Sequence, residues 1–347
     1  MDTIEIVKKL IAFKSITPHD KGAIDFISNI LKANGFACNH LEFGNNNEEV
    51  KNLYASFTNG KGPNICFAGH TDVVPPGNLD QWKTNPFSAV IKNGILFGRG
   101  ANDMKGAIGS FLSAGLKFIK NKKFNGTLSF LITGDEEGIA EYGTKKVVEW
   151  LENQKIKIDF CVVGEPTNPN YMGEMVKIGR RGSLNGILEI VGKQGHVAYP
   201  ERAKNPFPDL LKFCEKLIEP INDSNNFFQN SNIEITSIDT GNEITNLIPS
   251  HAKVLFNVRF NNSFSSKKII EFIKKRLDGV GKNYEITFKV SGESFYNCTD
   301  RLSESLVKAI RHITVKKPQL STNGGTSDAR FISNISPVIE FGLVGKN

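Results

Sequence analysis

The chain has 347 residues, of which 39% are hydrophobic and 23% charged, and it carries a formal net charge of +7 at pH 7. This length exceeds a usual single core, so two domains are expected, and the composition is ordinary for a soluble globular protein. The lysines are spread over predicted helix faces without interleaved aromatic residues, which favours a basic surface or a small anionic substrate over nucleic acid.

The N-terminal segment and the cysteines indicate in which cellular compartment the protein is expected. Residues 1–10 show an amphipathic helical pattern capped by Asp2 or Thr3, unlike a signal peptide, and no apolar run is long enough to span a bilayer. The cysteines are scattered without paired spacing, which is typical of reduced thiols. They are Cys38, Cys66, Cys161, Cys214 and Cys298. We therefore expect a cytoplasmic protein with no membrane partner.

Up to about residue 175 the chain alternates helical and strand patterns, which predicts an α/β layer with a largely parallel sheet flanked by helices. The predicted helices cover 23–34, 106–120 and 143–154, and the predicted strands cover 53–57, 64–68, 127–133 and 160–164. In open α/β sheets the functional crevice lies at the carboxyl ends of the strands. Candidate functional residues are therefore sought directly after these strands.

From about Val176 the pattern changes to a β-α-β-β-α-β order, which predicts an inserted α+β domain of the ferredoxin-like kind. Its expected strands are 183–191, 233–238, 252–260 and 284–290, and its helices are 208–219 and 266–277. The predicted domains are 1–177 with 292–347, and 178–291. A helix at 303–314, a loop at 323–328 and a strand at 338–342 return to the first domain.

Metal-ligand types follow the predicted strand at 64–68. His70 and Asp72 are two residues apart on extended chain, so their side chains point the same way and can address one locus. A structural histidine beside an acid would give the same short pattern. The conjunction with further acids after other strands is what favours a metal site.

Three adjacent acids follow the strand at 127–133. Asp135, Glu136 and Glu137 repel one another unless cations compensate their charges, although a solvated acidic turn has the same composition. Asp103 precedes a long predicted helix and Glu165 follows the strand at 160–164. Together with His70, these positions favour a metal hydrolase.

Seven motifs spread along the chain together resemble one known family. They are residues 70–77 (HTDVVPPG), 98–100 with 103–106 (GRG and DMKG), 134–138 (GDEEG), 164–167 (GEPT), 179–183 (GRRGS), 195–200 (GHVAYP) and 324–328 (GGTSD). The chain is similar to the di-zinc aminoacylase and carboxypeptidase family (peptidase M20), and the resemblance covers essentially its whole length. It implies a catalytic domain with a zinc-peptidase-like sheet and an inserted dimerisation or lid domain.

The resemblance implies two zinc ions per subunit, for which cobalt could substitute. His70 and Glu165 would bind one ion, Asp103 would bridge both ions, and Glu137 would bind the second. This ligand set has a chemical rationale, because zinc accepts imidazole and carboxylate and a bridging carboxylate brings two cations within about 3.5–4 Å.

The resemblance also implies two further roles beside the metal. Glu136 would be the general base that takes a proton from water and passes it to the leaving amine. Asp72 would orient His70, as carboxylates behind zinc-bound histidines commonly do.

Substrate recognition is implied mainly for the inserted domain. His196 would cross a homodimer interface and help to stabilise the tetrahedral oxyanion of the partner's active site. The groups implied to hold substrate carboxylates are Arg180, Asn246, Arg259, Gly324, Gly325, Thr326 and Ser327. The family usually has Asn-Asn before an Ile-Pro, whereas this chain has Thr245-Asn246, so one amide contact differs.

The function expected from the resemblance is hydrolysis of a linear amide, with succinate released from N-succinyl-diaminopimelate in lysine and cell-wall precursor synthesis. The alternatives are deacetylation of acetylornithine or a dipeptidase activity on the same scaffold. An alternative of another class is a metal-deficient, non-catalytic binding protein.

One departure from the family pattern concerns the second zinc, which there takes a histidine shortly after the loop that matches 323–328. The last histidine of this sequence is His312, in the preceding predicted helix. This pattern predicts a truncated product, or a protein with one zinc or without activity. Truncation is the interpretation that we favour, because the apolar strand at 338–342 ends where the ligand loop should begin.

Overall fold

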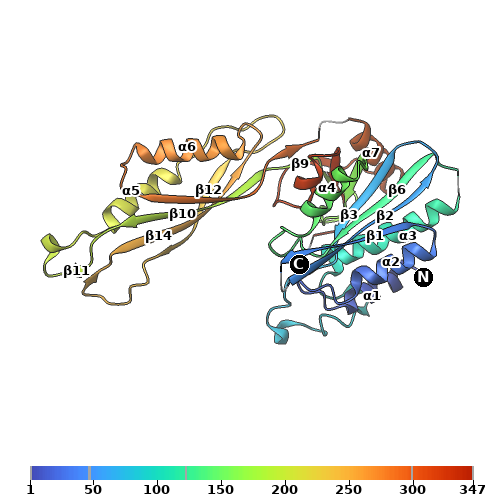
Figure 1. The fold of residues 1–347 in the computed structure, drawn as a ribbon, viewed down its shortest axis with the longest axis horizontal. Coiled ribbons are helices and arrows are strands. Elements are labelled where there is room, and N and C mark those ends of the chain that lie inside the picture. Colours follow the sequence, from blue (N-terminus) through green and yellow to red (C-terminus); the bar gives the residue numbers. More distant parts are fainter. Residues whose placement is uncertain (1, 46–47, 122, 298–299, 346–347) are drawn as a thin grey trace. The chain divides into compact units, whose positions relative to one another are not determined.

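The computed structural model describes residues 2–45, 48–121, 123–297 and 300–345, so Cys298 lies outside the described residues. The chain divides into two compact units (Figure 1). Unit 1 comprises residues 1–178, 297–321 and 327–347, and unit 2 comprises residues 179–296 and 322–326. The chain therefore passes between the units four times, and the short loop 322–326 packs with unit 2.

Unit 1 is built on an eight-stranded sheet that confirms the predicted α/β class. Its strands in spatial order are β1 (Ala37–Asn45), β2 (Glu48–Asn59), β6 (Gly126–Thr133), β3 (Asn64–His70), β7 (Phe160–Val163), β18 (Val338–Glu340), β8 (Met175–Lys177) and β17 (Gln319–Ser321). The four central strands β6, β3, β7 and β18 run parallel, as do β8 and β17. The remaining neighbours pair antiparallel.

The helices of unit 1 cover this sheet with amphipathic faces. They are α1 (Thr3–Ala12), α2 (Ala23–Ala33), α3 (Gly106–Lys120), α4 (Thr144–Asn153), α7 (Asp300–Thr314) and α8 (Ala329–Ile332). The Asp2 carboxylate caps α1 by accepting from the Glu5 amide at 3.0 Å, as the sequence predicted. Apolar side chains of α1, α2 and α3 pack with those of β2, β3 and β6 into one core. Each fully buried Leu or Ile contributes roughly 1.5–3 kcal/mol to it.

A long connection joins β3 to α3 and carries three short elements. These are a 3₁₀ turn at Leu79–Gln81 and the hairpin of β4 (Val90–Lys92) with β5 (Ile95–Phe97). The segment Ala101–Lys105 then leads into α3 and contains Asp103 in a non-helical conformation. This connection therefore carries Asp103 back towards the end of β3.

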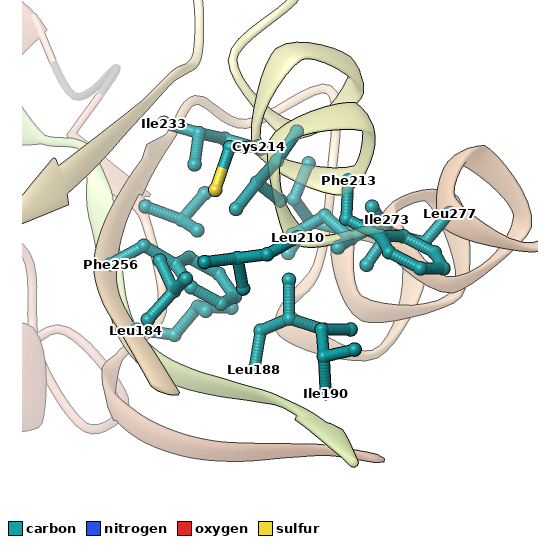
Figure 2. Close-up of a cluster of buried hydrophobic side chains, with 14 of the residues drawn as sticks. Leu184, Leu188, Ile190, Leu210, Phe213, Cys214, Ile233, Phe256, Ile273 and Leu277 are labelled. Carbon is teal, nitrogen blue, oxygen red and sulfur yellow. The ribbon is translucent and has the colours of Figure 1, made fainter. Parts of the chain in front are cut away.

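Unit 2 contains the predicted β-α-β-β-α-β domain. Its antiparallel sheet has the order β12 (Asn232–Asp239), β14 (His251–Phe260), β10 (Gly182–Val191) and β15 (Glu285–Gly292), covered by α5 (Phe207–Leu217) and α6 (Ser266–Asp278). Alternate residues of β10 and β14 meet the helices in one apolar core (Figure 2). Phe256 lies over Gly186 so closely that a Cβ there would stand 2.0 Å from the ring, so this packing requires glycine.

Two short antiparallel pairs complete unit 2. Strand β9 (Gly179–Arg180) pairs with β16 (Phe295–Tyr296), and β11 (Gly195–His196) pairs with β13 (Leu247–Ile248). Among the described residues of the whole chain, no helix has the length and apolar character needed to cross a membrane.

Candidate metal centre

Three parallel strands bring the predicted ligands to one edge of the sheet in unit 1. Neighbouring strands β6, β3 and β7 are apolar and buried, and the register pairs His70 with Thr133. Because parallel strands end at the same edge, the residues that follow them meet there. His70 ends β3, Glu136 and Glu137 follow β6, and Glu165 lies two residues after β7.

His70 is the centre of the cluster. Its side chain is buried, with Nε2 3.1 Å from Asp103 Oδ1 and 3.8 Å from Glu165 Oε1. Its other ring nitrogen, Nδ1, lies 2.9 Å from the backbone carbonyl oxygen of Asp72. A carbonyl oxygen only accepts, so this contact requires a proton on Nδ1, and Nε2 is the nitrogen that would give up its proton to bind a metal ion.

The Asp72 carboxylate joins two loops that carry predicted ligands. Its Oδ1 is 3.6 Å from His70 Nδ1, beyond hydrogen-bond distance. It accepts instead from the backbone amides of Glu136, at 3.2 Å, and Glu137, at 2.9 Å. The structure therefore assigns the direct hydrogen bond to His70 to the Asp72 carbonyl and the bracing of the 136–137 loop to its carboxylate.

Among the described residues of unit 1, two groups of side chains have the spacing of metal ligands. One is His70 with Asp103 and Glu165, and the other is His70 with Glu136 and Glu137, and within each group the candidate ligand atoms lie within 4.8 Å of one another. Imidazole and carboxylate are the donors that zinc accepts in hydrolytic sites. The cluster therefore fits a cation site by donor type and spacing.

The electrostatics of the cluster are those of crowded, buried carboxyls. Burial, reinforced by neighbouring carboxylates, raises the pKa of Glu136 to about 8 and that of Glu165 well above its ordinary value. Burial lowers the pKa of His70, but the hydrogen bond to Asp103 and the nearby acids outweigh it and raise this pKa well above 6.5. A divalent cation would reverse these shifts, because it favours ionised carboxylates and neutral imidazole.

Two buried acids beside the cluster were missed by the sequence reasoning. Asp328 is 5% exposed, lines the same small cavity as Glu136 and Glu165, and has its pKa raised by burial to about 6. Glu340 is fully buried and accepts from the Ser327 hydroxyl at 2.5 Å. The sequence offers a signal for each: Asp328 is the acid that ends the 324–328 motif, and Glu340 is an acid within the otherwise apolar strand β18.

Because of this hydrogen bond, the side chain of Ser327 has a different environment from the other loop residues, 324–326, that are implied to bind substrate. Its side chain is 2% exposed and its hydroxyl is directed to Glu340 in unit 1. Gly324, Gly325 and Thr326 belong to unit 2. Ser327 therefore lies where it would support the loop.

Arg180 and the loop 322–326 come together inside unit 2. Arg180 Nη1 donates to the carbonyl of Asn323 at 3.0 Å. Gly324 has φ +106°, and a Cβ there would stand 2.3 Å from Arg180 Nη1. The loop thus closes on the guanidinium only with glycine at this position.

The remaining predicted substrate residues also belong to unit 2. His196 is exposed on β11, and the next residue, Val197, donates from its amide to the carbonyl of Asn246 at 3.0 Å, so His196 and Asn246 lie on adjacent segments. Arg259 lies on β14, and its Nε donates to Asn257 Oδ1 at 2.9 Å. The predicted metal ligands and base all lie in unit 1.

Comparison with known proteins identifies relatives of this chain. The model of peptidase family M20/M25/M40 matches residues 66–347. A succinyl-diaminopimelate desuccinylase of Pelagibacter ubique is 51% identical, with 99% of this chain and 91% of that protein covered. The enzyme of the same name from Wolbachia pipientis wMel is 47% identical, with 100% and 86% covered.

Solved structures show the same fold at low sequence identity. An M20 family metallo-carboxypeptidase from Sulfolobus solfataricus has a TM-score of 0.81 and 18% identity, with 98% of this chain and 91% of that chain covered. A dinuclear metal-binding M20 peptidase from Bacillus subtilis has a TM-score of 0.71 and 16% identity, with 99% and 89% covered. These likenesses confirm the predicted fold class.

Proposed function

This chain belongs to peptidase family M20/M25/M40, and we propose that it hydrolyses N-succinyl-LL-2,6-diaminopimelate to succinate and LL-2,6-diaminopimelate. The observation that carries this proposal is the 47–51% identity, over 98–100% of the chain, to proteins named for that reaction. The cluster around His70 supports it, because imidazole and carboxylates at metal-ligand spacing suit amide hydrolysis.

The donor set around His70 fits a divalent metal centre, and we propose two zinc ions, with cobalt as a substitute, of which the second takes only Asp103 and Glu137 from this sequence. His70 and Glu165 would hold one ion, Glu137 the other, and Asp103 both. Two observations support the role proposed for Asp103: its Oδ1 lies 3.1 Å from His70 Nε2, and its charge also acts on Glu137. When bound, the ions would polarise the amide carbonyl and make the attacking water more acidic.

Glu136 is the proposed general base. It takes the proton of the attacking water as the new C–O bond forms, and it delivers that proton to the amine nitrogen as the C–N bond breaks. Burial raises the pKa of its carboxyl to about 8 in the metal-free protein, and bound cations would lower this pKa and favour the ionised form that a base requires. The two amide bonds to Asp72 hold the turn from which it projects.

The proposed substrate contacts lie in unit 2. Arg180 with the loop 324–326, and Arg259, would bind the substrate carboxylates, because guanidinium groups match carboxylates in two-point hydrogen bonds. Asn246 would add an amide contact and His196 would stabilise the oxyanion. A net charge of +7 also suits an anionic substrate.

We also propose that the protein acts in the cytoplasm as a homodimer that associates through unit 2. The four described cysteines are free, which accords with a reducing compartment. The pair β11 and β13, on which His196 is exposed and which Asn246 directly precedes, is the segment proposed to reach the partner. Sedimentation of the purified protein would show a single monomer-sized species if this proposal is wrong.

Succinate release by the purified, zinc-loaded protein tests the function. The assay would compare N-succinyl-LL-2,6-diaminopimelate with N-acetylornithine at matched concentrations, with Glu136→Gln as the inactive control. We expect kcat/KM to be higher for the succinyl substrate. A higher value for N-acetylornithine, or equal rates for wild type and Glu136→Gln, would contradict the proposal.

A further inference from the structure

A short segment after α1, residues 13–17, lies beside the loop that follows β3 in unit 1. Val73 N donates to the carbonyl of Ser15 at 2.9 Å, and Thr17 N donates to the carbonyl of Val73 at 3.2 Å, so the two stretches run parallel. The Ser15 hydroxyl also donates to the carbonyl of Thr71 at 2.6 Å, and Ser15 is fully buried. The segment 13–17 is therefore joined to the loop at the end of β3.

The same segment holds the turn that contains Asp103. Lys105 ends this turn, its side chain is fully buried, and Nζ donates to the carbonyl of Phe13 at 2.9 Å. The Ser15 hydroxyl lies 3.5 Å from this carbonyl, so its single proton goes to the nearer carbonyl of Thr71. The Phe13 carbonyl is thus the acceptor for Lys105.

The burial of a charged side chain at this position has to be explained. A fully buried ammonium is destabilising unless other groups compensate it. The carbonyl of Phe13 accepts from Lys105, and the negative charges of Asp20 and Asp72 act on it as well. A methionine would occupy similar space without any charge to desolvate. The ammonium of Lys105 therefore points to a role beyond packing.

The two attachments act on the spacing between two proposed ligands of one metal ion. His70 ends β3, directly before Thr71, and its Nε2 lies 3.1 Å from Asp103 Oδ1. Because Asp103 is in a non-helical conformation, its place depends on the contacts that hold its turn. The segment 13–17 is bound to both stretches of chain, so it can keep their ligands at one separation.

We propose that Lys105 is a positioning residue for the ligand Asp103. Its ammonium joins the turn of this ligand to the segment 13–17. Ser15 joins the same segment to the loop after His70. The inference rests on the proposed function, in which Asp103 and His70 bind metal. Lys105 is assigned no contact with metal or substrate, so its loss should appear in metal affinity and in coordination geometry.

Lys105→Met keeps a side chain of similar length but removes the ammonium. We expect the Kd of the purified protein for its first Co²⁺ or Zn²⁺, measured by competition with a chelator, to rise by about 10–100-fold, the range typical for groups behind metal ligands. At saturating Co²⁺ the visible absorption spectrum, which reports on ligand geometry, should also differ from that of the wild type. Lys117→Met is the matched control and should change neither quantity, because Lys117 is exposed on α3 of the same unit.

Ser15→Ala removes the other attachment, and it keeps the test decisive if Lys105→Met does not fold. It should raise the Kd for Co²⁺ by about 2–10-fold. Because both variants release the same segment, their effects should not multiply in full in the double variant. Wild-type affinity and spectrum in either folded variant, or losses that multiply in full, would overturn the inference. A merely structural role predicts lower stability of the metal-free protein with an unchanged Co²⁺ spectrum, and that result would overturn it too.

Failure of the proposed function can be told apart from failure of this inference, because metal binding is measured without substrate. If the wild type binds Co²⁺ but does not hydrolyse the succinyl substrate, the function is wrong, while the variants still test Lys105. If the wild type is active but Lys105→Met keeps its affinity and spectrum, the inference alone is wrong. A wild type that binds neither Co²⁺ nor Zn²⁺ overturns the inference as well, because Asp103 then has no metal to hold.

Discussion

Replacing Glu136 by Gln should stabilise the metal-free protein even as it removes the proposed base. Burial raises the pKa of Glu136 in the folded state to about 8, against about 4.5 for an unperturbed glutamate. Between these values the folded protein holds a proton that the unfolded chain has released. Stability therefore falls as the pH rises through this window, because ionisation favours the unfolded chain.

The size of the effect follows from the two pKa values. Each pH unit in the window costs about 1.4 kcal/mol, so the carboxyl lowers the free energy of unfolding by about 3 kcal/mol at pH 7 and about 5 kcal/mol above pH 8. Gln has nearly the same shape and does not titrate. The advantage of Glu136→Gln should thus be about 1 kcal/mol at pH 5 and grow with pH.

Urea unfolding of chelator-treated protein at pH 5, 7 and 8.5 measures this difference. Both tryptophans, Trp82 and Trp150, lie in unit 1, so their fluorescence reports on the unit that contains Glu136. Glu152→Gln is the matched control, because Glu152 is exposed on α4 of the same unit. A stability difference for Glu136→Gln that does not change with pH, or that has the opposite sign, would refute the reasoning.

Three further outcomes are expected from the site. With zinc present, Glu136→Gln should retain its metal but lose turnover by roughly 10²–10⁴-fold, and near-normal turnover would reject its role as base. Metal analysis should show that Asp103→Ala lowers the zinc content of both positions, whereas Glu165→Ala mainly lowers that of the position shared with His70. Full zinc occupancy after Asp103→Ala would exclude the bridging role of Asp103. Gly324→Ala should lower thermal stability through a backbone strain of about 1–3 kcal/mol. Gly325→Ala is the control and should not lower it, because the added Cβ meets nothing within 4 Å. Equal melting temperatures for the two variants would contradict this prediction.

The buried strands are the part of the fold that can be predicted from the sequence. Strands β3, β6 and β7 are apolar runs that end at motifs, and each was predicted within a few residues. Strand β1 was not predicted, because it is an edge strand in which only Leu41 is buried and no periodicity shows. Strands β8 and β17 have three residues each, which is too short for a pattern to appear.

The sequence identified residue types at the site but not the hydrogen bonds that arrange them. Asp72 was expected behind His70, yet its carboxylate bonds to backbone amides 64 and 65 residues further along the chain. Every residue carries such amides, so no side-chain pattern announces this contact. Ser327 was likewise expected among the substrate groups, and only the fold shows its hydroxyl directed to Glu340.

The position of Asp72 explains how the proposed base, Glu136, and the proposed ligand His70 are held at a fixed separation. Its backbone carbonyl accepts from His70 and its two carboxylate oxygens accept from the amides of Glu136 and Glu137, so one buried residue spans both loops. An ionised carboxylate has enough lone pairs for both amides, and bonds to a charged acceptor are stronger than neutral ones. A neutral amide side chain would offer one oxygen for two donors. The spacing between His70 and Glu136 therefore depends on a buried carboxylate to which the proposal assigns neither substrate nor metal.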